Sequence, residues 1–230
     1  MQVKQLLPPP LRRTIGNTLR RLKGPQPRRY IPAGMSVADF FAALHAARAS
    51  YVVLRWFETL PDVEPGEDID MLVADADLPI LAPLLNPVAG GTPCDIYTVN
   101  GLKGTQYKGM AYFPAALAEK TISRRQTYKQ VFEVPSPEDH FMGLAYHAVY
   151  QKGPASGLPT RYSDVDPTSR PEHDYAGHLR RLADSLGLDV AIDMESLDEV
   201  LASKGYRPEP AMRAALMQVN PWIAHHLSAG

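Results

Sequence analysis

The sequence holds a single cysteine and no long apolar run, and both shortages exclude whole classes of protein. With Cys94 alone, neither an intrachain disulfide framework nor a cysteine-rich zinc site can form, and we expect a reducing, cytoplasmic location. No apolar segment approaches the roughly 18 residues that a bilayer span requires, so an integral membrane protein is not expected. The N-terminus also lacks the apolar segment of a secretory signal.

Several motifs of common enzymes are missing as well. The sequence contains no Walker loop, no G-x-G-x-x-G dinucleotide motif and no serine nucleophile elbow. What is present is a chain of 230 residues, 45% apolar and 21% charged, which suits one or two globular domains with a sizeable core. The 22 prolines predict many turns and at least one irregular loop.

Acidic side chains are absent from the first 30 residues, which hold eight lysines and arginines. The rest of the chain holds the other 16 of the 24 basic side chains and all 25 acidic ones, so a general nucleic-acid surface is not expected there. Leucines at helical spacing over residues 11–22 predict a short basic amphipathic helix. Two interpretations stay open: the arm folds back over the acidic body, or it contacts an anionic membrane or another acidic partner, peripheral to the inner face of the membrane, through Arg12, Arg13, Arg20 and Arg21.

Periodicity predicts α/β structure up to about residue 134. Ser36 followed by Asp39 resembles a capping box at the start of a helix over residues 36–49. Asn100-Gly101 is a hairpin signal after the third strand. The other expected elements are strands over 51–57, 68–73, 94–99 and 129–134, and helices over 77–85 and 114–120.

The pattern becomes helical at Ser136-Pro137-Glu138-Asp139, which combines an N-cap, a proline at the first helical position and an acidic first turn. Further helices are expected over 172–186, 196–204 and 209–219, after a polar loop over 153–171. The predicted organisation is a basic arm over 1–30, an α/β domain over 31–134 and an all-α domain over 135–230, with a ligand cleft between the two domains.

Two carboxylates stand side by side on one predicted strand. Asp68 and Asp70 are two residues apart, so both side chains leave the same face of the strand, while Ile69 and Met71 suit the opposite, buried face. Neighbouring acids in an apolar strand raise each other's pKa and resist desolvation, and a divalent cation removes that cost. Asp95, on the next predicted strand, can join them if the two strands are neighbours.

The order helix, strand, loop, acid-x-acid strand, helix and acid-bearing strand resembles the nucleotidyltransferase fold shared with DNA polymerase beta. The run YVVLRWFETLP followed by GEDIDMLV is similar to bacterial nucleotidyltransferase-like proteins associated with surface polysaccharide genes. This resemblance covers about residues 36–100. It implies a small mixed nucleotidyltransferase-like sheet flanked by helices, with the all-α domain behind it.

The resemblance also implies a mechanism. Asp68 and Asp70 would bridge two Mg²⁺ or Mn²⁺ ions, and Asp95 would be the third ligand and help to activate the acceptor hydroxyl. An NTP would then donate its nucleoside monophosphate to a hydroxyl of a sugar, a glycan precursor or a protein. Asp70→Asn is expected to remove metal binding and to stabilise the metal-free fold by relieving like-charge repulsion.

The sequence departs from the family at one point. The family carries a Gly-Ser motif before the first catalytic aspartate, and its backbone amides hold the triphosphate; here that interval contains Leu54-Arg55-Trp56-Phe57. Arg55 is a candidate phosphate ligand, or it pairs with Glu58, Glu67 or a catalytic aspartate. Weaker candidates for phosphate contact are Lys103, Lys152 and His147, for which surface or core positions are the alternatives.

Two functions from different classes therefore compete. The three acids favour a metal-dependent nucleotidyltransferase, whereas the missing Gly-Ser motif favours a non-catalytic module that binds a nucleotide, a phosphosugar or a partner protein. The nucleotidyltransferase half of a toxin–antitoxin pair is a third option, which ranks lower because such proteins are often smaller and usually keep the Gly-Ser turn.

Overall fold

The computed structural model of the protein describes residues 28–105 and 110–227. The basic helix expected over residues 11–22, with the four arginines proposed to contact a membrane, lies outside the described residues. Arg28 and Arg29 are the two basic residues of the arm that the structure includes. In the described part of the chain, no helix combines the length and the apolar character needed to cross a bilayer.

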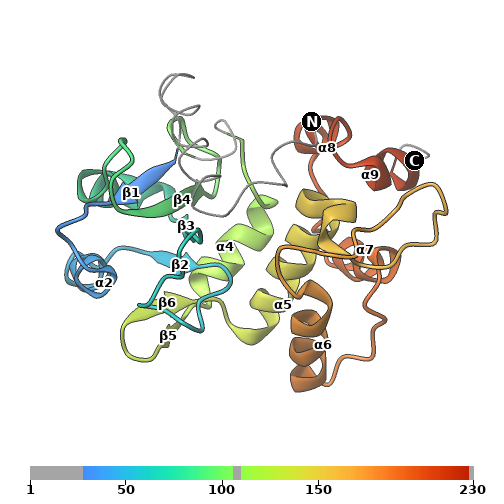
Figure 1. Ribbon diagram of the computed structural model, residues 1–230, viewed down its shortest axis with the longest axis horizontal. Coiled ribbons are helices and arrows are strands. Elements are labelled where there is room, and N and C mark those ends of the chain that lie inside the picture. The colour runs from blue at the N-terminus through green and yellow to red at the C-terminus, as the bar shows by residue number, and fades with distance from the viewer. Residues whose placement is uncertain (1–27, 106–109, 228–230) are drawn as a thin grey trace.

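A four-stranded mixed sheet forms the centre of the N-terminal half (Figure 1). Its strands lie in the order β1 (Arg29–Ile31), β4 (Thr92–Thr98), β3 (Ile69–Val73) and β2 (Tyr51–Val53). The two central strands, β3 and β4, are parallel, and each edge strand pairs antiparallel with its neighbour. The chain is thus a mixed α/β protein with a small mixed sheet, as the sequence predicts, although β1 was not expected.

Helix α2 (Val37–Ala46) covers one face of the sheet. It begins at Ser36, whose hydroxyl accepts a hydrogen bond from the Asp39 amide, so the predicted cap is confirmed. Phe40 and Phe41 point from this helix into a buried cluster that contains the residues on the outer face of β3. The predicted burial of Ile69 and its alternating neighbours on that face is also confirmed.

Short helices lie before and after β4. Helix α3 (Leu78–Leu81) lies between the parallel strands β3 and β4, and helix α4 (Ala115–Ser123) follows β4. Strands β5 (Gln126–Tyr128) and β6 (Phe132–Val134) form a separate two-stranded sheet.

The prediction of a hairpin at Asn100-Gly101 is wrong. Both sides of β4 are already paired, with β1 and with β3, so no edge of this strand is free for a hairpin partner among the described residues. The chain turns away instead: the Leu102 amide donates to the Thr98 hydroxyl oxygen, and Gly101 adopts a φ of 63°. A Cβ atom at Gly101 would overlap the backbone of Met110, so close packing of two loop segments requires glycine here.

The C-terminal half is helical. Helix α5 (Pro137–Tyr146) begins at the predicted cap, Ser136, and continues as a π-helix over His147–Lys152, which matches the expected end of this helix. A 3-10 helix over Gly153–Ser156 follows, and the remaining α-helices of the described chain are α6 (Tyr175–Leu186), α7 (Met194–Ser203), α8 (Pro210–Leu216) and α9 (Pro221–His226). Helix α9 was not expected, although Asn220-Pro221 is a usable start signal.

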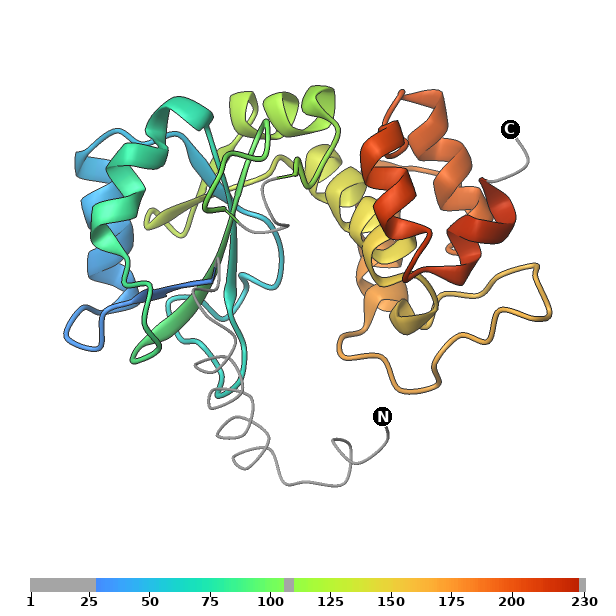
Figure 2. The ribbon, with the colours of Figure 1, turned by 90° about the horizontal axis from the view of Figure 1, so that it is seen from above.

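The second face of the sheet packs directly against these helices. Val52, Leu72 and Tyr97 belong to the same buried cluster as Phe141 of α5 and Trp222 of α9. Figure 2 shows α5 between the sheet and the C-terminal helices. The hydrophobic core therefore continues through the boundary expected near residue 135, and the division into two domains stays a prediction.

Asn220 joins the start of α9 to the π-helix. Its Nδ2 donates to the carbonyl oxygens of Val149 and Tyr150, both at 2.9 Å, and its Oδ1 accepts from the amides of Trp222 and Ile223. The side chain thus satisfies backbone groups at both elements, and it is 1% exposed.

We expect Asn220→Ala to lower the free energy of unfolding by about 3 kcal/mol, because it removes an N-cap and leaves buried carbonyl oxygens without donors. Urea unfolding measures the loss. Ser36→Ala is the control, since it removes an exposed N-cap and should cost only about 1 kcal/mol. Equal losses in the two variants would contradict the role of the buried amide.

Candidate functional site

The three predicted acids converge on one side of the sheet. Asp70 lies in β3 directly opposite Asp95 in the parallel strand β4, and Asp68 comes immediately before β3. Because Asp68 and Asp70 are two residues apart, their side chains share a face of the strand. The expectation that the two acid-bearing strands are neighbours is confirmed.

Arg28 links two of these acids. Its Nε lies 2.6 Å from Asp95 Oδ1, its Nη2 lies 2.8 Å from Asp95 Oδ2, and the same Nη2 also donates to Asp68 Oδ2. The sheet register explains the pairing: Arg29 of β1 is opposite Cys94 of β4, so Arg28 is opposite Asp95. Sequence reasoning missed Arg28 because it was counted only as one of the charges of the basic arm.

Arg55 neutralises the third acid. Its Nη2 lies 2.8 Å from Asp70 Oδ2, and the Tyr97 hydroxyl donates to Asp70 Oδ1 at 3.1 Å. The guanidinium also lies over the ring of Tyr112, 5.6 Å from its centroid. Of the alternatives that the sequence leaves open for Arg55, the structure shows the ion pair with a candidate catalytic aspartate.

The carboxylates are held in a costly electrostatic environment. Burial, together with the negative charges of Asp70 and Asp95, raises the pKa of Asp68 to about 7 from its ordinary value of 3.8. Burial also raises the pKa of Asp70, against the attraction of Arg55. Carboxyl groups with raised pKa values that lie beside one another are typical of sites that bind a cation or transfer protons.

We expect the raised pKa of Asp68 to affect how the free energy of unfolding changes with pH when no divalent metal is added. Between about pH 4 and 7, folded Asp68 holds a proton that the unfolded chain has lost, so this group makes the free energy of unfolding fall as pH rises. Buried His140, whose pKa is lowered by burial to about 3, contributes a slope of the opposite sign up to about pH 6.5.

The contribution of Asp68 is therefore obtained as a difference. Urea unfolding of the wild type and of Asp68→Asn should show that the variant gains stability relative to the wild type as pH rises from 4 to 7. A constant difference between the two proteins over this range would contradict the raised pKa of Asp68.

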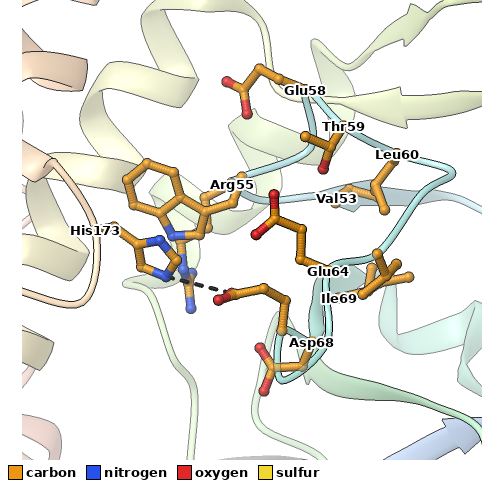
Figure 3. Close-up of a pocket in the computed structure, with 12 residues that line it drawn as sticks. Val53, Arg55, Glu58, Thr59, Leu60, Glu64, Asp68, Ile69 and His173 are labelled. Atoms are coloured by element: carbon orange, nitrogen blue, oxygen red, sulfur yellow. Dashed lines mark ion pairs between the residues drawn. The ribbon is translucent and has the colours of Figure 1, made fainter. Parts of the chain in front are cut away.

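A pocket of about 230 Å³ lies beside Asp68 (Figure 3). It is formed mainly by the loop between β2 and β3, and His173 reaches over from the helical half toward Glu67, the ion pair drawn as a dashed line in Figure 3. The apolar side chains in its wall include Val53, Leu60 and Ile69. Acidic side chains also line it: Glu58, Glu64, Glu67 and Asp68.

Trp56 forms part of the pocket wall. Its indole stacks on the His173 ring with centroids 4.3 Å apart, and His173 Nε2 lies 3.7 Å from Glu67 Oε2. Trp56 has a φ of 53°, in the left-handed region that favours glycine. The interval in which the resembling family has Gly-Ser thus contains a strained aromatic residue whose side chain contributes to the pocket.

Three weaker candidates lie elsewhere. Lys103 is exposed in the turn after β4, and Lys152 Nζ forms an ion pair with Glu172 Oε2 at 2.8 Å. His147 is buried between the hydroxyls of Tyr112 and Tyr175, with its pKa lowered by burial. The lining of the pocket includes Arg55 but not these three residues, and their contact with phosphate stays a prediction.

The donor chemistry of the acid cluster suits a divalent cation. In the part of the chain that the structure describes, no three histidine, cysteine or acidic side chains are already arranged to hold a metal ion. The three carboxylates nevertheless supply the hard oxygen ligands that Mg²⁺ prefers, and the Arg28 guanidinium already bridges two of them as a positive charge. Asp68, Asp70 and Asp95 are therefore the residues that would hold it.

The site thus combines clustered carboxylates, two buried or half-buried guanidiniums and an adjoining pocket with an aromatic wall. Such an arrangement offers carboxylate oxygens as ligands for a cation and a partly apolar surface beside them. No family model matches the chain, and neither the curated proteins nor the solved structures with which it was compared include a match.

Proposed function

We propose that the protein is a metal-dependent nucleotidyltransferase that moves a nucleoside monophosphate from an NTP to a hydroxyl of a sugar, a glycan precursor or a protein. The observation that carries the proposal is the register of the two parallel strands, which sets Asp70 directly opposite Asp95 with Asp68 next to them. Three carboxylates from two neighbouring strands are a costly arrangement without a cation.

The sheet supports the same proposal. A helix, α2, precedes the edge strand β2; the acid-x-acid segment begins the central strand β3; and the third acid lies on its parallel neighbour β4. This order agrees with the nucleotidyltransferase fold that the sequence resembles, and we therefore propose that fold for residues 31–134.

The roles of the acids follow from their positions. Asp68 and Asp70 would hold Mg²⁺ or Mn²⁺, which when bound neutralises phosphate charge and polarises the reacting oxygens. Asp95 would share in this binding, orient the acceptor hydroxyl and accept its proton as the hydroxyl oxygen attacks the α-phosphate and pyrophosphate leaves. Arg55 holds the Asp70 carboxylate in place through the 2.8 Å contact between Nη2 and Oδ2.

The pocket beside Asp68 is the proposed substrate site. Its position next to the acids would bring a ligand within reach of the cluster, and the stacked pair of Trp56 and His173 would give a base or a sugar an aromatic wall to pack against. The glutamates around it make an acidic surface, so a triphosphate would enter together with its divalent cation rather than alone.

A second function is favoured by a specific observation. Arg28 and Arg55 neutralise the acid cluster with charges from the chain itself, and the Gly-Ser turn is replaced by Trp56. A protein with these features could bind a nucleotide or a phosphosugar in the pocket without catalysing transfer.

Incubation with each labelled NTP, Mg²⁺ and a glycan extract separates the two functions. Transfer of label to an acceptor by the wild type, and its loss in Asp68→Asn, would support the enzyme. Binding of nucleotide without turnover of any of the four NTPs would support the non-catalytic module instead.

A further inference from the structure

Arg28 forms ion pairs with two of the three acids of the cluster, Asp68 and Asp95. We propose that Arg28 is an exchangeable internal counter-ion, and that a divalent cation binds at Asp68 and Asp95 only when the Arg28 guanidinium leaves them. This inference rests on the metal site of the proposed function. It adds a form of regulation, because metal binding is coupled to release of the Arg28 side chain and to loosening of β1.

The contacts support direct competition. The guanidinium uses Nε and Nη2 on the two oxygens of Asp95, and Nη2 also contacts Asp68 Oδ2. These are the carboxylate oxygens that a metal ion would need as ligands. A guanidinium fork held by a carboxylate is a strong, directional interaction, so it must be broken before the same oxygens turn to a metal.

The position of Arg28 makes it exchangeable. It lies immediately before β1, a three-residue strand at the edge of the sheet, which in the described chain pairs with β4 and forms an isolated bridge between Tyr30 and Asn86. Short edge strands with few contacts open more readily than central ones.

Arg55 provides the contrast. Its side chain is 6% exposed against 19% for Arg28, and it lies next to the central part of the sheet, over the ring of Tyr112. Arg55 is therefore the permanent partner of Asp70, and Arg28 is the partner that can leave.

The charge balance favours an exchange over joint occupancy. Counting these five groups alone, with all three carboxylates ionised as metal binding requires, the acids and the two guanidiniums carry a formal charge of −1. If a divalent cation replaces Arg28, the cluster with Arg55 becomes neutral, whereas a metal bound beside both arginines would give +1. Like charges on the same oxygens oppose the joint state.

The test is Mn²⁺ binding, measured by calorimetry and by electron paramagnetic resonance on the full chain. Arg28→Ala should bind Mn²⁺ about tenfold more tightly than the wild type, or bind it where the wild type does not, because a charge-assisted contact no longer competes. Arg28→Lys should fall between them. Arg124→Ala is the control: it also removes one positive charge and an ion pair, with Glu138, and should bind like the wild type.

Hydrogen exchange on the wild type gives an independent result that needs no variant. Saturating Mn²⁺ should speed exchange of the β1 amides, including the Tyr30 amide that donates to the Asn86 carbonyl oxygen. Unchanged or slower exchange in β1, with Mn²⁺ bound, would overturn the proposal even if Arg28→Ala failed to fold.

The outcomes separate this inference from the function on which it rests. Equal Mn²⁺ affinity in the wild type and in folded Arg28→Ala would overturn the exchange and leave the metal site intact. Weaker binding in Arg28→Ala would also overturn it, because Arg28 would then position the ligands. Absence of Mn²⁺ binding from the wild type and from both Arg28 variants would overturn the inference and the metal-dependent function together.

Discussion

Asp68→Asn is expected to lower the rate of nucleotidyl transfer by about a thousandfold or more while leaving the free energy of unfolding unchanged or slightly higher. A metal ion in such a site contributes several kcal/mol to the transition state, and each 1.36 kcal/mol is a factor of ten in rate. The fold tolerates the change because Asp68 is the acid whose pKa is raised to about 7 by burial and by its two neighbours.

Single-turnover transfer of labelled nucleotide, followed with urea unfolding of the same preparation, measures both effects. Asp62→Asn is a suitable control, because Asp62 is an exposed acid of the same loop outside the pocket lining, and its activity should stay close to that of the wild type. A variant at Asp68 that keeps a tenth of the activity would show that this carboxylate does not hold an essential cation.

Asp70→Asn, unlike Asp68→Asn, is expected to destabilise the protein, lowering the free energy of unfolding by about 3–5 kcal/mol. The substitution leaves Arg55, whose side chain is 6% exposed, as a buried charge without its carboxylate partner. The sequence alone predicts the reverse, namely that relief of repulsion stabilises the metal-free protein. The structure changes this expectation because Arg55 is buried and Asp70 is its carboxylate partner, so the substitution leaves a buried guanidinium without its counter-ion, although burial also raises the pKa of Asp70.

A double-mutant cycle tests the assignment. Arg55→Met together with Asp70→Asn removes the stranded charge, so it should recover most of the stability that Asp70→Asn loses, and the two sites should be strongly coupled. Asp68→Asn serves as the matched control, since it removes a carboxylate from the same cluster without stranding Arg55. If Asp70→Asn and Asp68→Asn unfold at the same urea concentration, the buried ion pair is not a stabilising contact.

The prediction of individual elements succeeded where the signal was local. The cap at Ser36, the start of α5 at Ser136 and the shared buried face of Ile69, Met71 and Val73 on β3 all depend on residues within a few positions of one another. The hairpin expected at Asn100-Gly101 failed because its outcome depends on distant strands, β1 and β3, which already occupy both sides of β4.

The candidate site divides in the same way. The spacing of Asp68 and Asp70 and the apolar setting of Asp95 indicate an acid cluster from the residue pattern alone. His147, by contrast, lies on a helix as expected, but the helix turns it into the core between Tyr112 and Tyr175. Which face of a helix meets the core depends on the packing of the other helices, and its own sequence carries only part of that information.

By itself, the sequence determined the kinds of element, the shared face of the two aspartates on β3 and the presence of a third acid on a later strand, because side-chain periodicity is a local property of the backbone. Only the tertiary structure decided the register of Asp70 against Asp95 and the identity of their counter-ions. Arg28 reaches Asp68 and Asp95 across separations of 40 and 67 residues. Contacts of that range depend on how strands pair and pack, and no short pattern in the chain encodes them.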